Sequence, residues 1–315
     1  MCFHHPYTSE PGRSPTRKGN PMQDYELRPY AGTLADAQGI LAVERQTFKE
    51  CPYDPQELRQ RLQHPEVRLW LAEADGRVIA FAAGLRTVGI RGPRLEADLL
   101  AVGLAWQRKG IGTALLRRLC SEADACGTVR GFVSTLNVPS QGAFAHAGFV
   151  PSQEVYDLMI YRIRGRVPRP ISAWGGRVGT LSGYDQAGEA AALAPDLPNA
   201  EALLQASQQP GTLLLSSQAA GAVTGFVEYL QVHTLLYSGL WLETVTTAPG
   251  YSSILKALIA AGVEQAKARG LDQVSCMVPN SNWPLRAALL AEGFAPLDRY
   301  RAWSWTPSSS REAHP

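Results

Sequence analysis

The chain has 315 residues, enough for two domains of ordinary size that each bury a core of their own. Its 30 lysines and arginines nearly balance its 28 aspartates and glutamates, and the net charge of +2 argues against general nucleic-acid binding. No apolar run approaches the ~20 residues of a membrane span, so a helical membrane protein is excluded. The five cysteines are scattered without a metal-ligand spacing, which indicates a cytoplasmic protein without a metal site.

The two ends of the chain have the composition of unstructured segments. Residues 1–21 are rich in proline, glycine, serine and arginine, and they lack the apolar core of a secretory signal. We expect either a disordered leader over 1–21 or a translation start at Met22, and a disordered tail over 307–315.

The first half of the chain predicts strands and helices in alternation. The expected elements are a strand at 25–28, helices at 34–48 and 55–62, strands at 67–74 and 77–87, a strand at 98–104, a helix from 112 to near 127, a strand at 130–136, a short helical segment after Asn137 and a strand at 155–163. Asp75-Gly76 is the turn signal of a hairpin. This pattern is typical of α/β units around a mixed sheet.

The second half predicts a parallel series after a proline- and arginine-rich linker at 165–172. Its expected elements are helices near 188–193 and 200–206, a hairpin at 212–232, a strand at 240–246, a helix at 253–269, a strand at 273–278, a helix at 284–291 and a strand at 299–305.

One loop in the first half has the character of an anion site. Residues 107–112 read Gln-Arg-Lys-Gly-Ile-Gly between a strand-like run and a helix-like run. Glycines at a helix start let the backbone approach a ligand closely, and the first N–H groups of the helix have no partner within it. With Arg108 and Lys109 beside them, these groups favour a pyrophosphate.

The segment downstream strengthens this interpretation. A strand-like run ends at Asn137, a short helix-like run follows, and Gly148-Phe149 closes it. The Gln-x-x-Gly-x-Gly loop and this Asn-to-Gly-Phe segment, in this order, resemble the GCN5-related N-acetyltransferases, known as the GNAT superfamily. The resemblance implies two tandem acyl-CoA N-acyltransferase folds, because the pattern occurs twice.

The repeat extends over nearly the whole chain. Residues 97–116 align without gaps with 240–259 at a shift of 143 (253 − 110). Asn282 and Gly293-Phe294 correspond to Asn137 and Gly148-Phe149 at a shift of 145 (282 − 137). We therefore expect an N-terminal domain over 22–164 and a C-terminal domain over 173–306.

The second copy has lost the features that a pyrophosphate needs. Gly110 and Gly112 become Ser253 and Leu255, and both cations become Tyr251 and Ser252. We expect the second domain to keep the fold without the cofactor, although Gly250 and the serines leave room for weak anion binding.

The resemblance assigns acetyl-CoA as the co-substrate of the first domain. It implies that backbone groups of Leu100, Ala101 and Val102 bind the pantetheine arm as an added strand, with the Val102 N–H polarising the thioester carbonyl. It also implies that Asn137 contacts the pantetheine. The pyrophosphate would lie on the loop and the first turn of the helix, formed by Gln107, Arg108, Lys109, Gly110, Ile111, Gly112 and Thr113.

Two acidic residues on the preceding strand are candidates for the general base that an alkylammonium acceptor requires. Asp98 lies where members of the family often carry an acid, and Glu96 shares its face of the strand. The alternative is a structural role for either, for example an ion pair with Arg94.

The usual general acid of the family, a tyrosine seven residues after the asparagine, is replaced by Phe144. A thiol of pKa ~8.5 can leave as a thiolate, so activity is not excluded. Water or another group such as Tyr156 is an alternative proton donor, with packing as the structural role of Tyr156. His146, on the short helix, is a candidate to approach the cofactor, or else an exposed surface histidine. The loop 48–54 is a candidate lining of the acceptor groove, or an ordinary helix connection, and Cys51 has no evident base beside it.

The sequence thus predicts a cytoplasmic enzyme that transfers acetyl from acetyl-CoA directly to a primary amine. The acceptor is a small molecule or a peptide, and the protein is a monomer or homodimer. The alternative is a non-catalytic acyl-CoA-binding sensor or scaffold.

Overall fold

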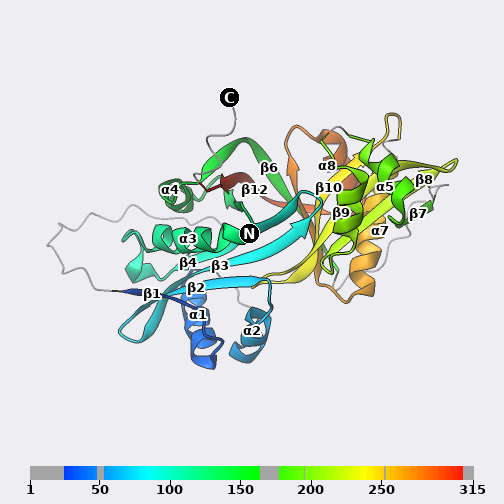
Figure 1. The fold of residues 1–315 in the computed structure, drawn as a ribbon. Helices are drawn as coiled ribbons and strands as arrows, with labels where there is room; N and C mark the ends of the chain where they lie inside the picture. The colour runs from blue at the N-terminus through cyan, green and yellow to red at the C-terminus, as the bar shows by residue number, and fades with distance from the viewer. Residues whose placement is uncertain (1–24, 48–52, 164–176, 195, 252, 308–315) are drawn as a thin grey trace. The chain divides into compact units, whose positions relative to one another are not determined.

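The structure of the protein is a computed structural model, and it describes residues 25–47, 53–163, 177–194, 196–251 and 253–307 (Figure 1). The expected leader at 1–21 and linker at 165–172 lie outside the described residues, as do 308–315 of the expected tail. Within the described ranges, no helix combines the length and apolar character that crossing a bilayer requires.

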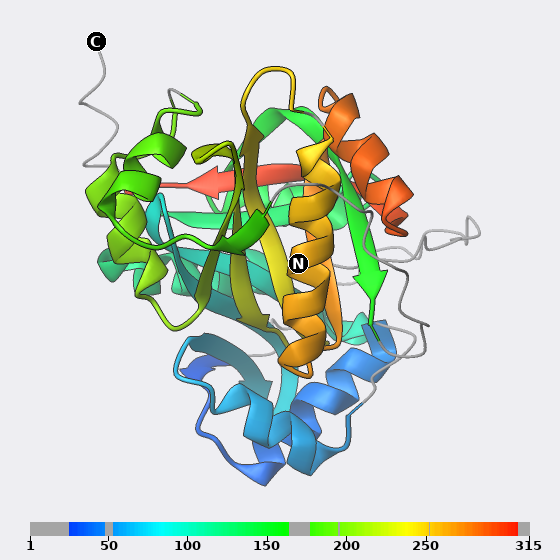
Figure 2. The ribbon, with the colours of Figure 1, turned by 90° about the vertical axis from the view of Figure 1, so that its right-hand side faces the viewer.

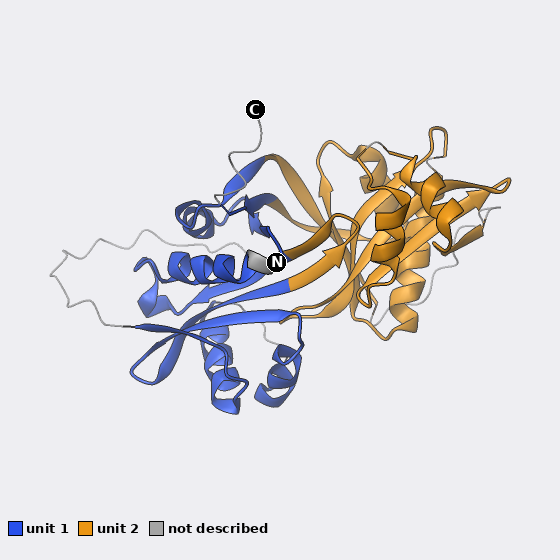
Figure 3. Ribbon diagram, viewed as in Figure 1, with its two compact units in different colours: residues 1–85, 95–152, 301–315 blue, residues 86–94, 153–300 orange. Residues whose placement is uncertain are grey.

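The chain forms two compact units that alternate along the sequence (Figure 3). Unit 1 comprises residues 1–85, 95–152 and 301–315, and unit 2 comprises 86–94 and 153–300. The units therefore do not follow a single division near the linker. Unit 1 includes the segment that begins at Arg301, and unit 2 includes the segment Arg86–Arg94.

Unit 1 is built on strands in the order β1-β2-β3-β4-β5-β12. Its strands are β1 (Glu26–Pro29), β2 (Val67–Ala74), β3 (Arg77–Gly89), β4 (Gly92–Val102), β5 (Val129–Ser134) and the last residues of β12 (Ala295–Trp305). The pairs β1/β2 and β2/β3 are antiparallel, whereas β4/β5 is parallel.

The helices of unit 1 lie on both faces of this sheet. Helices α1 (Leu34–Thr47) and α2 (Pro55–Leu62) lie on one face and α3 (Ile111–Ser121) on the other (Figure 1). The short helix α4 (Val138–His146) packs with α3, and Trp303 of β12 completes their buried cluster. Single turns of 3₁₀ helix, η1 (Leu104–Trp106) and η2 (Glu122–Ala125), flank α3.

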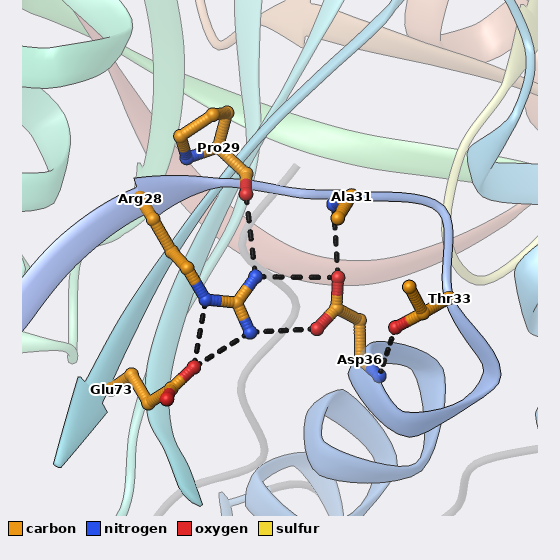
Figure 4. A network of polar contacts seen from close by, with 6 residues as sticks. All are labelled: Arg28, Pro29, Ala31, Thr33, Asp36 and Glu73. Atoms are coloured by element: carbon orange, nitrogen blue, oxygen red, sulfur yellow. Dashed lines mark hydrogen bonds and ion pairs between the residues drawn. The ribbon is translucent and has the colours of Figure 1, made fainter. Parts of the chain in front are cut away.

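The connection between β1 and α1 is fixed by a partly buried ion-pair network (Figure 4). Arg28 lies 2.7 Å from both Asp36 and Glu73, and Asp36 also accepts the backbone N–H of Ala31 at 2.9 Å. Burial by itself raises the pKa of Asp36, but the hydrogen bonds from Arg28 and Ala31 outweigh it, and the pKa lies below its usual value.

Unit 2 contains strands in the order β6-β11-β10-β9-β8-β7. They are β6 (Val150–Arg162), β7 (Arg177–Thr180), β8 (Thr212–Ala219), β9 (Ala222–His233), β10 (Ser238–Thr247) and β11 (Gln273–Pro279). The helices are α5 (Tyr184–Ala191), α6 (Ala200–Ser207), α7 (Ile254–Ala268) and α8 (Trp283–Ala291). Helix α7 crosses one face of the strands (Figure 2), packing on Leu213 and Leu215, while α5 and α6 pack on the intervening Leu214.

The observed elements follow the predicted series, but several bounds differ. Helix α3 ends at Ser121 rather than near Gly127, α5 begins at Tyr184 rather than near Gly188, and β12 begins at Ala295 rather than Arg299. Strand β4 begins at Gly92 rather than Asp98, and 3₁₀ helix replaces its expected end at Leu104. Strand β6 begins at Val150, five residues before its expected start. Strand β7 was not expected, because its four residues carry no strand-like apolar alternation.

Candidate active site

The glycine loop opens onto the start of α3. Gly110 is the residue before the helix and has φ +81°, a conformation in which a Cβ is strained, and Arg108 has φ +61°. A Cβ at Gly110 would meet no atom within 4 Å, and one at Gly112 would make only ordinary contacts, the nearest at 3.5 Å to Leu100. The space that a Cβ would occupy at these two glycines is therefore not filled by the described residues, and the N–H groups of a helix start can donate to an anion.

The loop side chains support its shape and charge. Gln107 donates from Nε2 to the carbonyl oxygen of Val102 at 3.0 Å, which ties the loop to the end of β4. The Nζ of Lys109 lies 4.4 Å from the ring centre of Trp106. Arg108 and Lys109 are both exposed, so the positive charge predicted at this place lies on the surface of unit 1.

The register of the parallel pair β4/β5 ends just before Asp98. It consists of Leu95 with Val129, Glu96 with Arg130, and Ala97 with Gly131, and it ends there although β4 continues to Val102. The backbone of 98–102 on this edge is consequently not bonded to β5. Such an edge accepts an extended chain as an added strand.

The side chains of β4 also change faces in this region. Leu95 and Ala97 belong to the cluster beneath α3, and Leu100 and Val102 pack against the same cluster. Strict alternation would put residues 97 and 100 on opposite faces, so the strand has an irregularity between them. The irregularity falls on the residues next to Asp98.

The two acidic candidates have different surroundings. Glu96 is ion-paired with Arg130 of β5, whose guanidinium donates to both carboxylate oxygens at 2.8 and 3.1 Å and lies over the ring of Phe132. Asp98 is 5% exposed and follows the last paired residue of β4. The sequence did not identify Arg130 as the partner. Its partner role follows from the β4/β5 register, which a single sequence does not contain. Arg94, which the sequence offered as one possible partner, lies 2.8 Å from Glu243.

The side-chain amide of Asn137 accepts a hydrogen bond through its oxygen, whereas its nitrogen donates to no described residue. Its Oδ1 accepts the N–H of Ser140 at 3.1 Å and caps α4. Its Nδ2 is buried and meets no acceptor among the described residues. A buried donor of this kind is costly unless a partner satisfies it, so its position at the end of β5 fits a ligand acceptor.

Phe144 is part of the core. It is fully buried, its ring centre lies 4.7 Å from that of Phe149 and 6.1 Å from that of Trp303, and a Cβ on Gly131 would lie 2.7 Å from its ring. A hydroxyl at this position would also be buried.

Of the remaining candidates, His146 and Tyr156 lie within the described residues, whereas the acceptor loop is described only from Tyr53 onward. His146 is exposed, with Nδ1 2.7 Å from the carbonyl oxygen of Gly142, and Tyr156 lies on β6 within unit 2. Residues 48–52, including Cys51, lie outside the described residues. Tyr53 stacks with Arg61, and Asp54 caps α2.

In the second copy, β10 and β11 repeat the short parallel register of β4 and β5. The residue at the start of α7 that corresponds to Gly112 is Leu255. The parallel register of β10 and β11 ends at Trp241 with Ser275, and β10 is irregular at Glu243. Asn282 caps α8 as Asn137 caps α4, accepting from Leu285 at 3.2 Å. Leu255, at the position of Gly112, is 8% exposed and belongs to the core of unit 2.

The sequence of residues 37–149 matches the model of the acetyltransferase (GNAT) family. No curated protein matches the sequence. The chain is similar to a GCN5-related N-acetyltransferase from Sphaerobacter thermophilus, with a TM-score of 0.59 and 19% identity over 91% of this chain and 96% of that one. It is also similar to a tandem GNAT protein from the clavulanic acid biosynthesis pathway, with a TM-score of 0.56 and 18% identity over 90% and 100%.

A third likeness is to a fungal multi-domain β-N-acetylglucosaminidase with a GCN5-related glucosamine N-acetyltransferase region. Its TM-score is 0.58 at 15% identity, and the match covers 90% of this chain but only 38% of the fungal chain. The family match is thus confined to residues 37–149 of the first half. The chain as a whole has the mixed α/β fold of tandem GNAT proteins, which confirms the resemblance and the fold class drawn from the sequence.

Proposed function

We propose that the protein is an N-acetyltransferase that moves acetyl from acetyl-CoA to a primary amine, with its donor site in the N-terminal copy. The observation that carries this proposal is the buried Nδ2 of Asn137, a donor without an acceptor among the described residues. It lies in the same unit as the Gly110 loop and the unpaired edge of β4.

The donor would contact three groups of this chain. The N–H groups at the start of α3, with Arg108 and Lys109, bind the pyrophosphate. The edge of β4 at Leu100–Val102 binds the amide groups of the pantetheine arm as an added strand, and Asn137 donates to it. Orientation by fixed backbone groups brings the thioester carbonyl to the Val102 N–H, which stabilises the oxyanion.

Transfer then needs a neutral amine. Asp98 accepts a proton from the ammonium, directly or through a water, and the amine nitrogen attacks the carbonyl carbon. The C–N bond forms as the C–S bond breaks, the electron pair leaves with the thiolate of coenzyme A, and the nitrogen gives up its second proton to solvent as the amide forms. Because Phe144 donates no proton, the thiolate is protonated by solvent or another group.

The second copy supports the structure rather than the chemistry in this proposal. Leu255 at the position of Gly112 is packed in the core, and Tyr251 replaces a cation of the loop. Neither glycine at the helix start and neither cation of the first loop is kept at the matching positions, which supports one donor site per chain.

The second candidate function is a non-catalytic acyl-CoA sensor or scaffold. The observation that favours it is the complete burial of Phe144, because this position provides no general acid. Both candidates require donor binding, so binding alone does not distinguish them.

The test combines calorimetry with thiol release. Titration of the full chain with acetyl-CoA is expected to give one site, and a panel of small amines and peptides is expected to contain at least one acceptor that drives release of free thiol. Tight binding at one site with no turnover over the hydrolysis background across the panel would favour the sensor. Absence of binding would overturn both functions.

A further inference from the structure

The hairpin segment between β3 and β4 is bound inside unit 2. Residues 86–94 belong to this unit, although the strands on both sides of the segment continue in unit 1. Strand β4 therefore begins in unit 2 and carries Glu96 and Asp98 two and four residues after Arg94.

A fully buried carboxylate holds the tip of the hairpin. Glu228 of β9 accepts the backbone N–H of Ile90 at 2.7 Å through Oε1 and the hydroxyl of Thr244 at 3.0 Å through Oε2. A Cβ on Gly89 would collide with Glu228 Oε1, so the close approach requires glycine. The carbonyl oxygen of Val88 also accepts from Thr212 at 2.6 Å.

A second carboxylate holds the start of β4. Glu243 lies 2.8 Å from Arg94 and accepts the indole N–H of Trp241 at 3.1 Å. Both members of the ion pair are largely buried. Breaking a buried pair by removing one charge is costly, so Arg94 is held in one position.

These two carboxylates have no part in the donor site, and a core alone does not need them. Burial raises the pKa of Glu228, with the N–H of Ile90 acting in the opposite direction. An ionisable group that is kept in the core needs hydrogen-bond partners there. Here the contacts are with the hairpin that leads into the strand of the candidate base.

We propose that Glu228 and Glu243 are positioning residues that fix the start of β4 and thereby the register of Asp98 and of the Leu100–Val102 edge. This rests on the proposed function of unit 1 for its catalytic consequence. Asp98 is about 14 Å along the strand from Arg94, so the carboxylates act through the backbone and not by touching substrate. In this proposal the second copy, which has lost the glycines of the phosphate loop, anchors the strand that carries the candidate base of the first copy.

The experiment measures hydrogen exchange in the full chain without substrate. Glu243→Gln weakens the pair with Arg94 at constant size, and Gly89→Ala independently displaces Glu228. Asp196→Asn is the matched control, because it removes the 2.6 Å pair with Arg91 on the same hairpin, where both side chains are exposed. The helix α7 reports the stability of unit 2.

Glu243→Gln and Gly89→Ala are expected to raise amide exchange over residues 95–102 about tenfold, with α7 and the control unchanged. They are also expected to lower kcat. Exchange over 95–102 equal to wild type in both variants, or an equal rise in α7, would overturn the positioning role. If the wild-type protein turns over no amine, the proposed function fails, while the exchange result still decides whether β4 is anchored in this way.

Discussion

Arg130 donates to both carboxylate oxygens of Glu96 across the parallel pair β4/β5, from Nη2 at 2.8 Å and from Nε at 3.1 Å. The pair lies one register step before the two strands separate. Glu96 cannot approach an amine without breaking this ion pair. Asp98 is the residue after the last one in the β4/β5 register, so the two acidic candidates differ in their place on the strand.

Replacing Asp98 by asparagine is expected to lower kcat by about 10²–10⁴-fold, because the variant cannot accept the proton of the ammonium. The affinity for acetyl-CoA is expected to stay within twofold, since the donor contacts are elsewhere. Glu96→Gln is the matched control, with an expected loss of less than tenfold. Steady-state rates and calorimetry check this, and equal losses in the two variants would remove the distinction.

Gly112→Leu is expected to abolish calorimetric binding of acetyl-CoA. Its side chain extends from a Cβ that already lies 3.5 Å from Leu100, into the space that the anion needs. Ser253→Gly in the second copy is the control and is expected to leave one site per chain. Two sites in the native protein would contradict the assignment to a single copy.

Gly131→Ala is expected to destabilise the fold by about 1–3 kcal/mol, because the added methyl lies 2.7 Å from the ring of Phe144 in a packed core. Gly142→Ala is the matched control. It lies in α4 with no atom within 4 Å of the new Cβ, and alanine favours the helix, so stability rises by up to about 1 kcal/mol. Urea unfolding measures both. A neutral Gly131→Ala would contradict the close packing around Phe144.

The buried Asp36 predicts a loss of stability in acid. Its pKa in the folded protein lies below the ordinary value of about 3.9, so its ionised form stabilises the fold above pH ~4. This contribution disappears as the pH falls through the folded pKa. The midpoint temperature is therefore expected to fall more steeply below pH 4 in the wild type than in Asp36→Asn, which already lacks the charge. Parallel curves would show that Arg28 and Asp36 contribute nothing to the acid response.

Local signals in the sequence were sufficient for most elements of the fold. The bounds of the helix at 55–62 and the strand at 67–74 agree with the structure to the residue, because Asp54-Pro55 and Asp75-Gly76 mark them. The comparison of the two copies indicated the loss at Leu255, and the structure places this side chain in the core.

The long-range relationships could not be predicted. The partner of Glu96 depends on the β4/β5 register, and Arg94 was a plausible partner by proximity in sequence. The composition of the units depends on which strand ends pack together over more than 100 residues, as Arg94 with Glu243 does. Nothing in the local pattern around 301–305 assigns these residues to the unit built mainly from the first half of the chain.

That assignment of the last strand has a consequence for biosynthesis. Trp303 is a buried member of the core that contains Phe144, Leu115 and Val133. During synthesis the first half of the chain is made long before Trp303. The core of unit 1 therefore lacks this side chain until synthesis is nearly finished. Domains of this size generally fold as they are made, N-terminal part first. Here unit 1 is completed last, so a chain that is truncated during synthesis lacks a finished unit 1 even though it contains the whole first copy.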